Sequence, residues 1–394
     1  MSFAPARMEP VNKLLAALAC VATLVAGLSA VAVATTSKAT TYYVATTASA
    51  TNGNSCKKAG YRSVNTAIAR ASKGDTVHVC VGTYAESVKL SKAITLEGDT
   101  GAVIDATGQN VGVEVTASGA TVTGLTVQNS TGQGIFVHEV RNVKIMKNVI
   151  EHNDLGVGTS TYLYCTTANF VPDCGEGLHL SGVSSSTVSG NTIRNNSGGI
   201  LLSDELGPSH HNTIAGNSVT DNTKNCGITI VGHLAGAVTD AGKLAPKIAG
   251  VYKNIISGNT VTNNGTTGTG AGILLANPRA GMAVYQNTVS GNTISSNGLA
   301  GVQLNVNTTG QYLDGNVVSN NTIGTNNLLH SPSAGSGSTV GVSTFVATGA
   351  SGLAVTVTGN KISANTYGIY AGAGTTLTQS GNTFVDVTTP VLTA

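Results

Sequence analysis

Ionisable side chains that could perform acid–base chemistry gather in the middle of this 394-residue chain. The chain has only 8 His and 18 acidic residues, yet several of them follow the same motif in successive copies of a repeat. The densest group is the segment LLSDELGPSHH, residues 201–211. The candidate catalytic residues are Glu176, His179, Asp204, Glu205, His210, His211, His233 and Arg279.

These residue types suit the removal of a proton from a uronate sugar. A His or carboxylate with a pKa near neutrality can accept the C5 proton, and a cation can neutralise the adjoining carboxylate. We therefore assign proton acceptance to His179 or His233 and the substrate carboxylate to Arg279, while the acidic residues orient or tune the His. A glycoside hydrolase instead needs two carboxylates about 5–10 Å apart. Glu176 and Asp204, expected on neighbouring coils, would suit that reaction better than the adjacent Asp204 and Glu205.

Five of the eight candidates also have a purely structural interpretation. His210 and His211 can belong to a solvated loop, Asp204 and Glu205 can bind backbone amides at a turn, and His179 can be an outward-facing surface residue. Metal ligands stay unassigned, because the His residues lack the close H-x-H or H-x-x-x-H spacing of common metal sites. Calcium is the cofactor that we keep open.

A repeated motif must position these side chains. It reads G-N-[T/S]-[I/V]-x-x-N, followed shortly by G-[I/V]-x-[L/I], and it recurs at intervals of 22 to 43 residues. Alternation in the second part places Ile200 and Leu202 on one side of a strand, and stacked coils would bury such sides together. Seven copies carry two Asn residues five positions apart, to which we assign a structural role at the turns: Asn148 and Asn153, Asn191 and Asn196, Asn217 and Asn222, Asn259 and Asn264, Asn292 and Asn297, Asn321 and Asn326, Asn360 and Asn365.

The N-terminal part of the chain indicates export and a capped solenoid. In residues 1–34, Arg7 and Lys13 precede an apolar run with A-x-A cleavage points, the layout of a secretory signal peptide. An uncleaved anchor and lipidation at Cys20 are the alternatives. The segment SVNTAIARASKG, residues 63–74, predicts a short capping helix with Val64, Ala67, Ile68 and Ala71 on one face and Gly74 at its end. We expect one β-helix domain over 35–394, with the cap and first coils at about 42–100.

The amino-acid composition limits the classes of partner that the protein is expected to bind. Charged residues make up 10% of the chain and the formal net charge is +2. Without a basic block or a charge run, the sequence indicates neither nucleic-acid binding nor membrane contact beyond the signal segment. The expected protein is a monomer that is secreted, periplasmic or on the cell surface, and its expected partner is a polysaccharide or cell-surface glycan.

Five Cys residues follow the signal segment. Export permits disulfides, and the loop-flanking positions lead us to pair Cys56 with Cys80 and Cys165 with Cys174. Cys226 lies on the same side of its strand as Ile228 and Ile230, so we expect a buried thiol. A catalytic thiol is disfavoured because no basic partner stands beside it.

The N-terminal part of the domain resembles the opening of pectate-lyase-like β-helix proteins. The matching order is Tyr42-Tyr43-Val44, the capping helix, Gly74-Asp75-Thr76-Val77, Gly82-Thr83-Tyr84 with Glu86 and Val88, and Ile94-Thr95-Leu96. The later copies resemble the parallel β-helix repeats of the same superfamily, which includes NosD-like proteins. The resemblance implies an all-β, single-stranded, right-handed parallel β-helix.

The same resemblance leaves the activity open. The chain lacks the D-P-H-[D/E] motif of alginate C5-epimerases, an obvious calcium-binding Asp cluster and a pectinesterase-like catalytic Asp motif. Two functions follow as expectations. One is a uronate-polymer lyase or epimerase acting along the strand face. The other is a non-catalytic, NosD-like scaffold or binding protein at the surface or in the periplasm.

Overall fold

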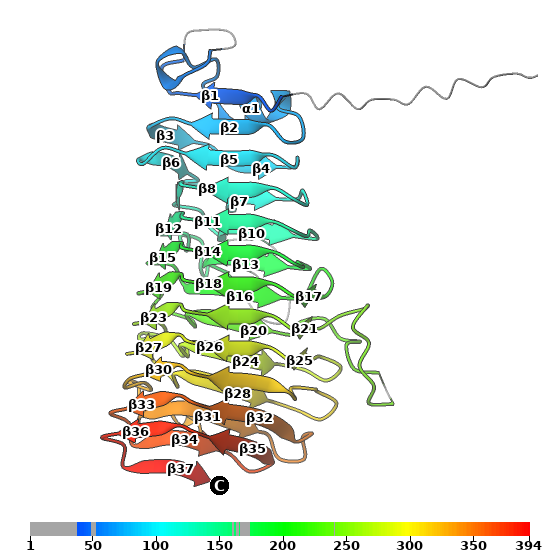
Figure 1. The fold of residues 1–394 in the computed structure, drawn as a ribbon, viewed down its shortest axis with the longest axis vertical. Helices are drawn as coiled ribbons and strands as arrows, with labels where there is room; N and C mark the ends of the chain where they lie inside the picture. The colour runs from blue at the N-terminus through cyan, green and yellow to red at the C-terminus, as the bar shows by residue number, and fades with distance from the viewer. Residues whose placement is uncertain (1–37, 49–52, 160, 163–164, 166–173, 240) are drawn as a thin grey trace, which may run out of the picture. The chain divides into compact units, whose positions relative to one another are not determined.

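Short apolar-polar alternations form strands that stack in parallel, coil upon coil (Figure 1). The computed structural model describes residues 38–394 apart from 49–52, 160, 163–164, 166–173 and 240. The predicted signal segment, residues 1–34, lies outside the described residues. Residues 39–394 form one unit. The predicted all-β parallel solenoid is confirmed.

Each full coil contributes one strand to each of three long parallel sheets. Sheet A holds β1 (Thr41–Val44), β2 (Thr76–Val79), β5 (Thr95–Gly98), β8 (Thr121–Thr123), β11 (Lys144–Met146), β14 (Thr187–Ser189), β18 (Thr213–Ala215), β22 (Ile255–Ser257), β26 (Thr288–Ser290), β29 (Asn316–Ser319), β32 (Leu353–Thr358) and β35 (Thr375–Ser380). Sheet B holds β3 (Gly82–Ala85), β6 (Ala102–Asp105), β9 (Thr126–Gln128), β12 (Val149–Glu151), β15 (Thr192–Arg194), β19 (Ser218–Thr220), β23 (Thr260–Thr262), β27 (Thr293–Ser295), β30 (Thr322–Ile323), β33 (Lys361–Ser363) and β36 (Thr383–Val385).

Sheet C carries the candidate site. It holds β4 (Val88–Leu90), β7 (Val111–Val115), β10 (Gln133–His138), β13 (Glu176–Ser181), β16 (Gly198–Ser203), β20 (Ile228–Val231), β24 (Ile273–Asn277), β28 (Val302–Val306), β31 (Val340–Val346), β34 (Tyr367–Ala371) and β37 (Thr389–Thr393). A small fourth sheet pairs β17 (Ser209–His210), β21 (Val251–Tyr252) and β25 (Val284–Tyr285) in the turns between sheets C and A.

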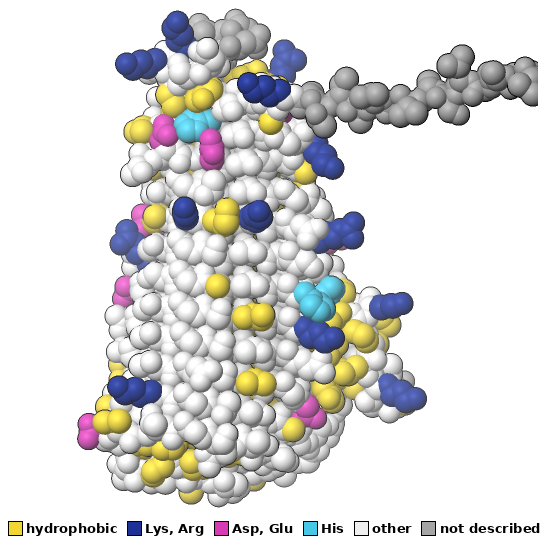
Figure 2. All heavy atoms as spheres, viewed as in Figure 1, with side chains coloured by type: hydrophobic (Ala, Val, Ile, Leu, Met, Phe, Trp, Pro, Cys, Tyr) yellow, Lys and Arg dark blue, Asp and Glu magenta, His cyan; other side chains and the backbone are white. Residues whose placement is uncertain are grey.

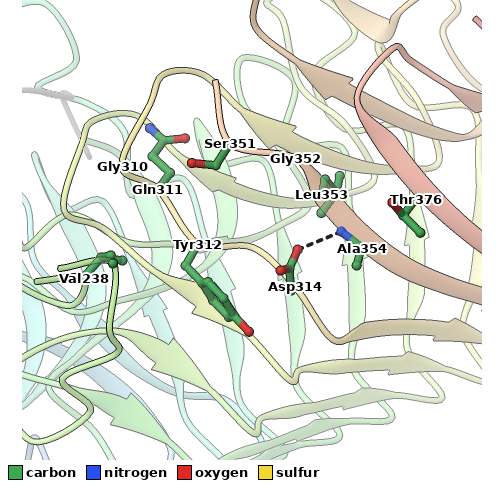
Figure 3. A pocket seen from close by; sticks show the side chains of 11 residues that line it. Val238, Gly310, Gln311, Tyr312, Asp314, Ser351, Gly352, Leu353, Ala354 and Thr376 are labelled. Carbon is green, nitrogen blue, oxygen red and sulfur yellow. Dashed lines mark hydrogen bonds between the residues drawn. The ribbon is translucent and has the colours of Figure 1, made fainter. Parts of the chain in front are cut away.

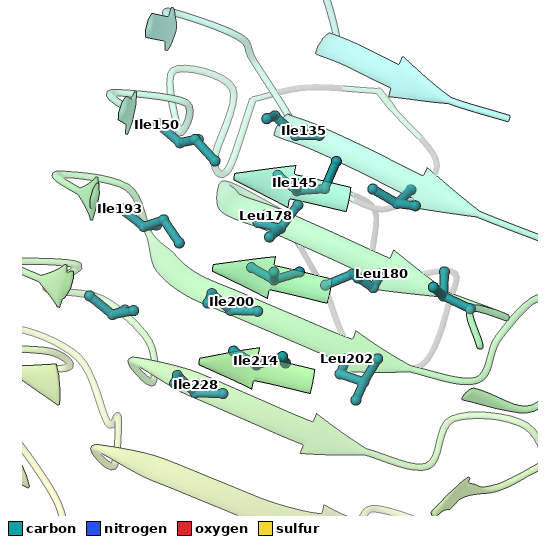
Figure 4. Packing of buried hydrophobic residues seen from close by; sticks show 14 of the residues in the cluster. Ile135, Ile145, Ile150, Leu178, Leu180, Ile193, Ile200, Leu202, Ile214 and Ile228 are labelled. Atoms are coloured by element: carbon teal, nitrogen blue, oxygen red, sulfur yellow. The ribbon is translucent and has the colours of Figure 1, made fainter. Parts of the chain in front are cut away.

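The core consists of aliphatic side chains in register along the solenoid. In sheet C, Leu178 lies opposite Ile200, which lies opposite Ile228 on the next coil. All three are fully buried, and Figure 4 shows these stacks converging between the sheets. Full burial of one such side chain stabilises the fold by roughly 1.5–3 kcal/mol. The predicted inward orientation of Ile200 and Leu202 is confirmed.

Buried Asn ladders connect the coils at the turns. Nδ2 of Asn217 donates to Oδ1 of Asn259 at 2.9 Å, and Asn259 repeats this contact with Asn292. This confirms the structural role of the repeated Asn. At these turns the left-handed backbone belongs to the residue before the ladder Asn, such as Gly216 with φ 63°. A third ladder, absent from the sequence analysis, runs through Asn212, Asn254, Asn287 and Asn316.

The N-terminal end is closed by α1 (Val64–Arg70). Its buried face, Val64, Ala67 and Ile68, matches the predicted capping helix, but the helix ends at Arg70 with Ala71 as its C-cap, before the predicted end at Gly74. The carboxylate of Glu86 accepts hydrogen bonds from the backbone N–H groups of Val64 and Asn65 at 2.8 and 3.2 Å. A negative charge at a helix N-terminus is favourable because the first N–H groups lack partners within the helix.

The disulfides join the cysteines in the predicted pairs, Cys56 with Cys80 and Cys165 with Cys174. Cys56 begins the short 3-10 helix η1 (Cys56–Lys58), and a second such helix, η3 (Pro332–Ala334), precedes β31. Cys226 is a free, buried thiol, and burial raises its pKa to about 11. No helix within the described residues is long and apolar enough to cross a membrane. Figure 2 shows a face on which charged side chains are few and scattered.

Candidate functional site

The parallel register of sheet C brings three of the predicted residues together, namely His179, Glu205 and His233. Ser181 of β13 lies opposite Ser203 of β16, and Leu202 lies opposite Ile230 of β20. Glu205 follows β16 by two residues, and His233 follows β20 by two residues. Because parallel strands end at the same edge of a sheet, these positions meet on neighbouring coils.

Glu205 is the centre of this cluster. One of its carboxylate oxygens contacts Nδ1 of His233, and the other accepts hydrogen bonds from the hydroxyls of Ser203 and Ser181. Nε2 of His179 lies 3.6 Å from the second oxygen and 2.9 Å from Oγ of Ser203. Glu205, one of the carboxylates predicted to orient the His, contacts both His179 and His233.

The electrostatics of the cluster favour an ionised Glu205. Burial alone would raise the pKa of this carboxyl, since the charged form loses its hydration. The hydrogen bonds and positive potential of His179 and His233 outweigh burial and hold the pKa of Glu205 well below its usual value. Glu205 therefore stays anionic at neutral pH.

Asp204 holds the backbone that carries His233. Its Oδ1 accepts from the backbone N–H groups of His233 and Leu234 at 2.5 and 2.9 Å, and its Oδ2 accepts from that of Gly250 at 2.6 Å. These contacts join the beginning and end of the long segment between β20 and β21, which extends sideways from the coils in Figure 1. Burial raises the pKa of Asp204 to about 6 although three amides bind its carboxylate.

Glu176 opens β13 and is almost completely buried. Its Oε1 accepts from Nδ2 of Asn225 at 3.2 Å. The residue opposite it in β16 is Gly198, and a Cβ at that position would lie 2.1 Å from Oε2 of Glu176. A side chain at position 198 would therefore displace Glu176.

The expected pairing of Glu176 with Asp204 across a glycosidic bond is wrong. The register pairs Glu176 with Gly198, and Asp204 lies six residues farther along the chain. At about 3.3 Å per strand residue this separates the two positions by about 20 Å. Neighbouring coils bring residues together only at matching positions along the strand, so this pair does not meet the hydrolase requirement.

A hollow of about 170 Å³ on the outer side of sheet C joins two parts of the predicted site. Glu176 and His233 both line it, together with Leu201, Asn225, Thr229, Val231, Leu274, Ala276, Pro278 and Asn307. Arg279 is half-buried in the turn after β24, directly after Pro278. At about 170 Å³ the hollow is smaller than the 300–1,000 Å³ of typical ligand sites.

His210 and His211 lie outside the Glu205 cluster. Nδ1 of His210 lies 2.8 Å from Nδ1 of His211, and the ring of His210 stacks on Tyr252. Tyr252 stacks on Tyr285, which contacts Tyr312 edge-on, so an aromatic row follows the fourth sheet. This aromatic row was not predicted from the sequence. Its signal is the pattern V-Y-[K/Q]-N at residues 251–254 and 284–287.

A larger cavity of about 360 Å³ lies at the end of the aromatic row (Figure 3). Tyr312, Gln311, Asp314, Ser351 and Thr376 are among its lining residues. Oδ1 of Asp314 accepts from the backbone N–H of Ala354 at 2.7 Å. None of the predicted catalytic residues lines this cavity, so it contributes nothing to the acid–base cluster.

The chain also matches a known protein family by sequence. The family model for the right-handed β-helix region matches residues 111–287 and 237–384. The chain belongs to the right-handed β-helix family. No curated protein sequence matches the chain.

Several solved structures share the fold of this β-helix protein. The A-module of the Azotobacter vinelandii mannuronan C-5 epimerase AlgE4 is 16% identical, with a TM-score of 0.52 over 82% of this chain and 89% of that one. The pectate lyase Pel9A is 17% identical, with a TM-score of 0.51 over 88% and 78%. A hyperthermoactive exopolygalacturonase from Thermotoga maritima is 9% identical, with a TM-score of 0.50 over 81% and 87%. Such low identities establish the shared fold alone.

Proposed function

We propose that this β-helix protein removes the C5 proton of a uronate polymer, as a lyase or an epimerase, at the hollow beside His233. The carrying observation is the contact between the Glu205 carboxylate and Nδ1 of a histidine that lines the hollow. A carboxylate on Nδ1 keeps the proton there, so Nε2 is the basic nitrogen. We assign proton acceptance to His233 rather than to His179, because His179 is completely buried and does not line the hollow.

The surrounding residues have distinct roles in this proposal. Glu205 is a positioning residue that orients His233 and stabilises the imidazolium formed when Nε2 takes the C5 proton. Ser181, Ser203 and His179 hold the Glu205 carboxylate in place. Asp204 fixes the backbone of His233. Arg279 binds the uronate carboxylate, which carries the negative charge that develops when the C5 proton leaves.

The chemical outcome depends on the fate of that charge. Elimination expels the oxygen on C4 and leaves a double bond between C4 and C5, which is the lyase reaction. Return of a proton to the opposite face of C5 gives the epimer. Both begin with the same proton abstraction, so the Glu205 cluster supports the step that they share.

The fold supports a linear polymer as substrate. Coils repeat at about 4.8 Å along the solenoid, close to the length of one sugar unit, so successive sugars can contact successive coils. The three structures named above are an epimerase of mannuronan, a pectate lyase and an exopolygalacturonase. Two disulfides and the predicted signal segment support secretion, a periplasmic location or display at the cell surface.

The test is a screen of alginate, pectate and glycosaminoglycans for the ultraviolet absorbance of an unsaturated product and for altered C5 configuration. We expect His233→Ala to lower kcat by at least about 100-fold, the usual contribution of a general base. The matched control is His210→Ala, because His210 lies outside the Glu205 cluster. Equal activity in the parent and His233→Ala would refute the assignment.

A non-catalytic binding scaffold is the second candidate. The observation that favours it is the structural use of Asp204, which is fully buried with both oxygens bound to backbone amides. In that case the cluster stiffens the turns of sheet C, and the solenoid face holds a glycan without changing it. Glycan binding by the parent that persists in His233→Ala, with no product after prolonged incubation, would support the scaffold.

A further inference from the structure

A second polar cluster lies on the outer side of sheet A, near the N-terminal end of the solenoid. The register places His78 of β2 opposite Glu97 of β5, and Val79 opposite Gly98. Val77 and Val79 point into the core, so His78 points outward. Cys80 and Asp99 come directly after these strands. The sequence H-x-C therefore lies beside E-x-D on the next coil.

The side chains of this cluster are in contact. Nδ1 of His78 lies 2.9 Å from Oε1 of Glu97, and its Nε2 lies 3.0 Å from Oδ1 of Asp99. The other oxygen of Asp99 lies 3.4 Å from Sγ of Cys56, which is bonded to Cys80. One donor atom from each of Cys56, His78, Cys80 and Asp99 lies within 4.8 Å of every other.

We propose that these four side chains bind one Zn²⁺ ion when the Cys56–Cys80 disulfide is reduced. Two thiolates, one imidazole nitrogen and one carboxylate oxygen are the donors that zinc prefers, and four of them complete a tetrahedral site. Nε2 of His78 is the ligand nitrogen because it faces Asp99. Glu97 holds Nδ1, the arrangement in which a carboxylate orients a zinc-bound histidine and increases its basicity.

Zinc binding requires prior reduction of the disulfide. A dithiol reductant supplies two electrons and two protons and becomes a disulfide, while the bond between Cys56 and Cys80 is replaced by two thiols. Zn²⁺ then displaces both thiol protons into solvent. In a tetrahedral site the two sulfurs lie about 3.8 Å apart. The 5.6 Å separation of the two Cα atoms permits this by side-chain rotation.

The disulfide-bonded state and the zinc-bound state would fix the same segment, which lies between β1 and α1. Cys56 belongs to η1, in the segment between β1 and α1, whereas Cys80 follows β2. The disulfide ties this segment to the first coil under oxidising conditions, and the zinc ion ties it under reducing conditions. The site is thus a redox-dependent metal clamp on the N-terminal cap.

The experiment compares oxidised protein with protein reduced by a phosphine that is then removed without oxygen. Zn²⁺ affinity is measured by competition with a chromogenic chelator, and Co²⁺ reports thiolate ligation through its charge-transfer absorption. We expect one Zn²⁺ per reduced chain and at least 100-fold weaker binding by the oxidised chain. His78→Ala and Asp99→Ala should each weaken binding by at least 10-fold, and Glu97→Gln by about 10–100-fold.

Controls address the other cysteines and the fold. Cys226→Ser and the double variant Cys165→Ser with Cys174→Ser should bind zinc like the parent. Zinc should raise the melting temperature of the reduced parent but not that of Cys56→Ser with Cys80→Ser, whose fold is checked by circular dichroism. The proposal is overturned if the reduced parent binds neither metal, or if it binds no more tightly than the oxidised parent. Unchanged binding in both His78→Ala and Asp99→Ala would also overturn it.

Discussion

Replacing Asp204 with Ala should loosen the segment that carries His233. The change removes three hydrogen bonds to a carboxylate, from the backbone N–H groups of His233, Leu234 and Gly250. Hydrogen bonds to charged groups contribute about 1.5–3 kcal/mol each, which gives roughly 5–9 kcal/mol for three. The buried charge offsets part of this gain. Burial raises the pKa of Asp204 from 3.8 to about 6 even though the same three hydrogen bonds lower it, so the cost of burying the charge exceeds what they recover.

The net expectation is that Asp204→Ala lowers the free energy of unfolding at pH 7 by less than the hydrogen-bond sum, on the order of a few kcal/mol. The matched control is Asp314→Ala, which removes one hydrogen bond, to the backbone N–H of Ala354, at a half-buried site. Urea unfolding followed by circular dichroism measures the difference. Limited proteolysis of the segment between β20 and β21 reports local opening.

The pH dependence gives this prediction a second test. The folded state binds a proton on Asp204 at about pH 6, whereas the unfolded chain does so near pH 4. The contribution of Asp204 to the stability of the parent therefore rises as pH falls from 7 toward 4, by up to about 3 kcal/mol. Asp204→Ala lacks this rise. If Asp204→Ala is no less stable than Asp314→Ala, and its segment resists proteolysis like the parent, the role assigned to Asp204 is wrong.

Two further predictions concern the coils. Asn259→Ala removes four ladder hydrogen bonds of about 1 kcal/mol each and should lower the free energy of unfolding by about 4 kcal/mol. Thermal unfolding measures this loss. The control is Thr260→Ala at the exposed neighbouring position, and an equal or larger loss of stability in that variant would contradict the prediction. Gly198→Ala places a Cβ against Glu176 and should lower kcat/KM on a uronate polymer by about 10-fold. Its melting temperature should change less than that of Asn259→Ala. An unchanged kcat/KM would exclude Glu176 from the site.

The strands of this fold were predictable because their physics is local. A period of two and the recurrent Asn pairs identify the coil, and they place Ile200 inward without any knowledge of its neighbours. The register also explains the meeting of Glu205 with His233, since both follow sheet C strands by two residues. Glu176 was misplaced relative to Asp204 because coil adjacency was counted without the position along the strand.

Turn residues were harder to place because turn lengths vary from coil to coil. His210 and His211 follow Glu205 closely in sequence, yet Ser209 and His210 form β17 of a separate sheet. The turn before sheet A also contains the third Asn ladder, whose Asn254 and Asn287 follow the stacked Tyr residues by two positions. Such contacts depend on how insertions of different length align, which alternation within single strands does not specify.

The most direct test of the central claim measures the release of deuterium from C5 of a C5-deuterated uronate polymer into solvent. This readout follows the step common to elimination and epimerisation, so it does not depend on which product forms. We predict deuterium release by the parent and by His210→Ala at similar rates, and release at least about 100-fold slower by His233→Ala. Absence of release from alginate, pectate and glycosaminoglycan polymers, or equal rates in the parent and His233→Ala, would contradict proton abstraction at this site.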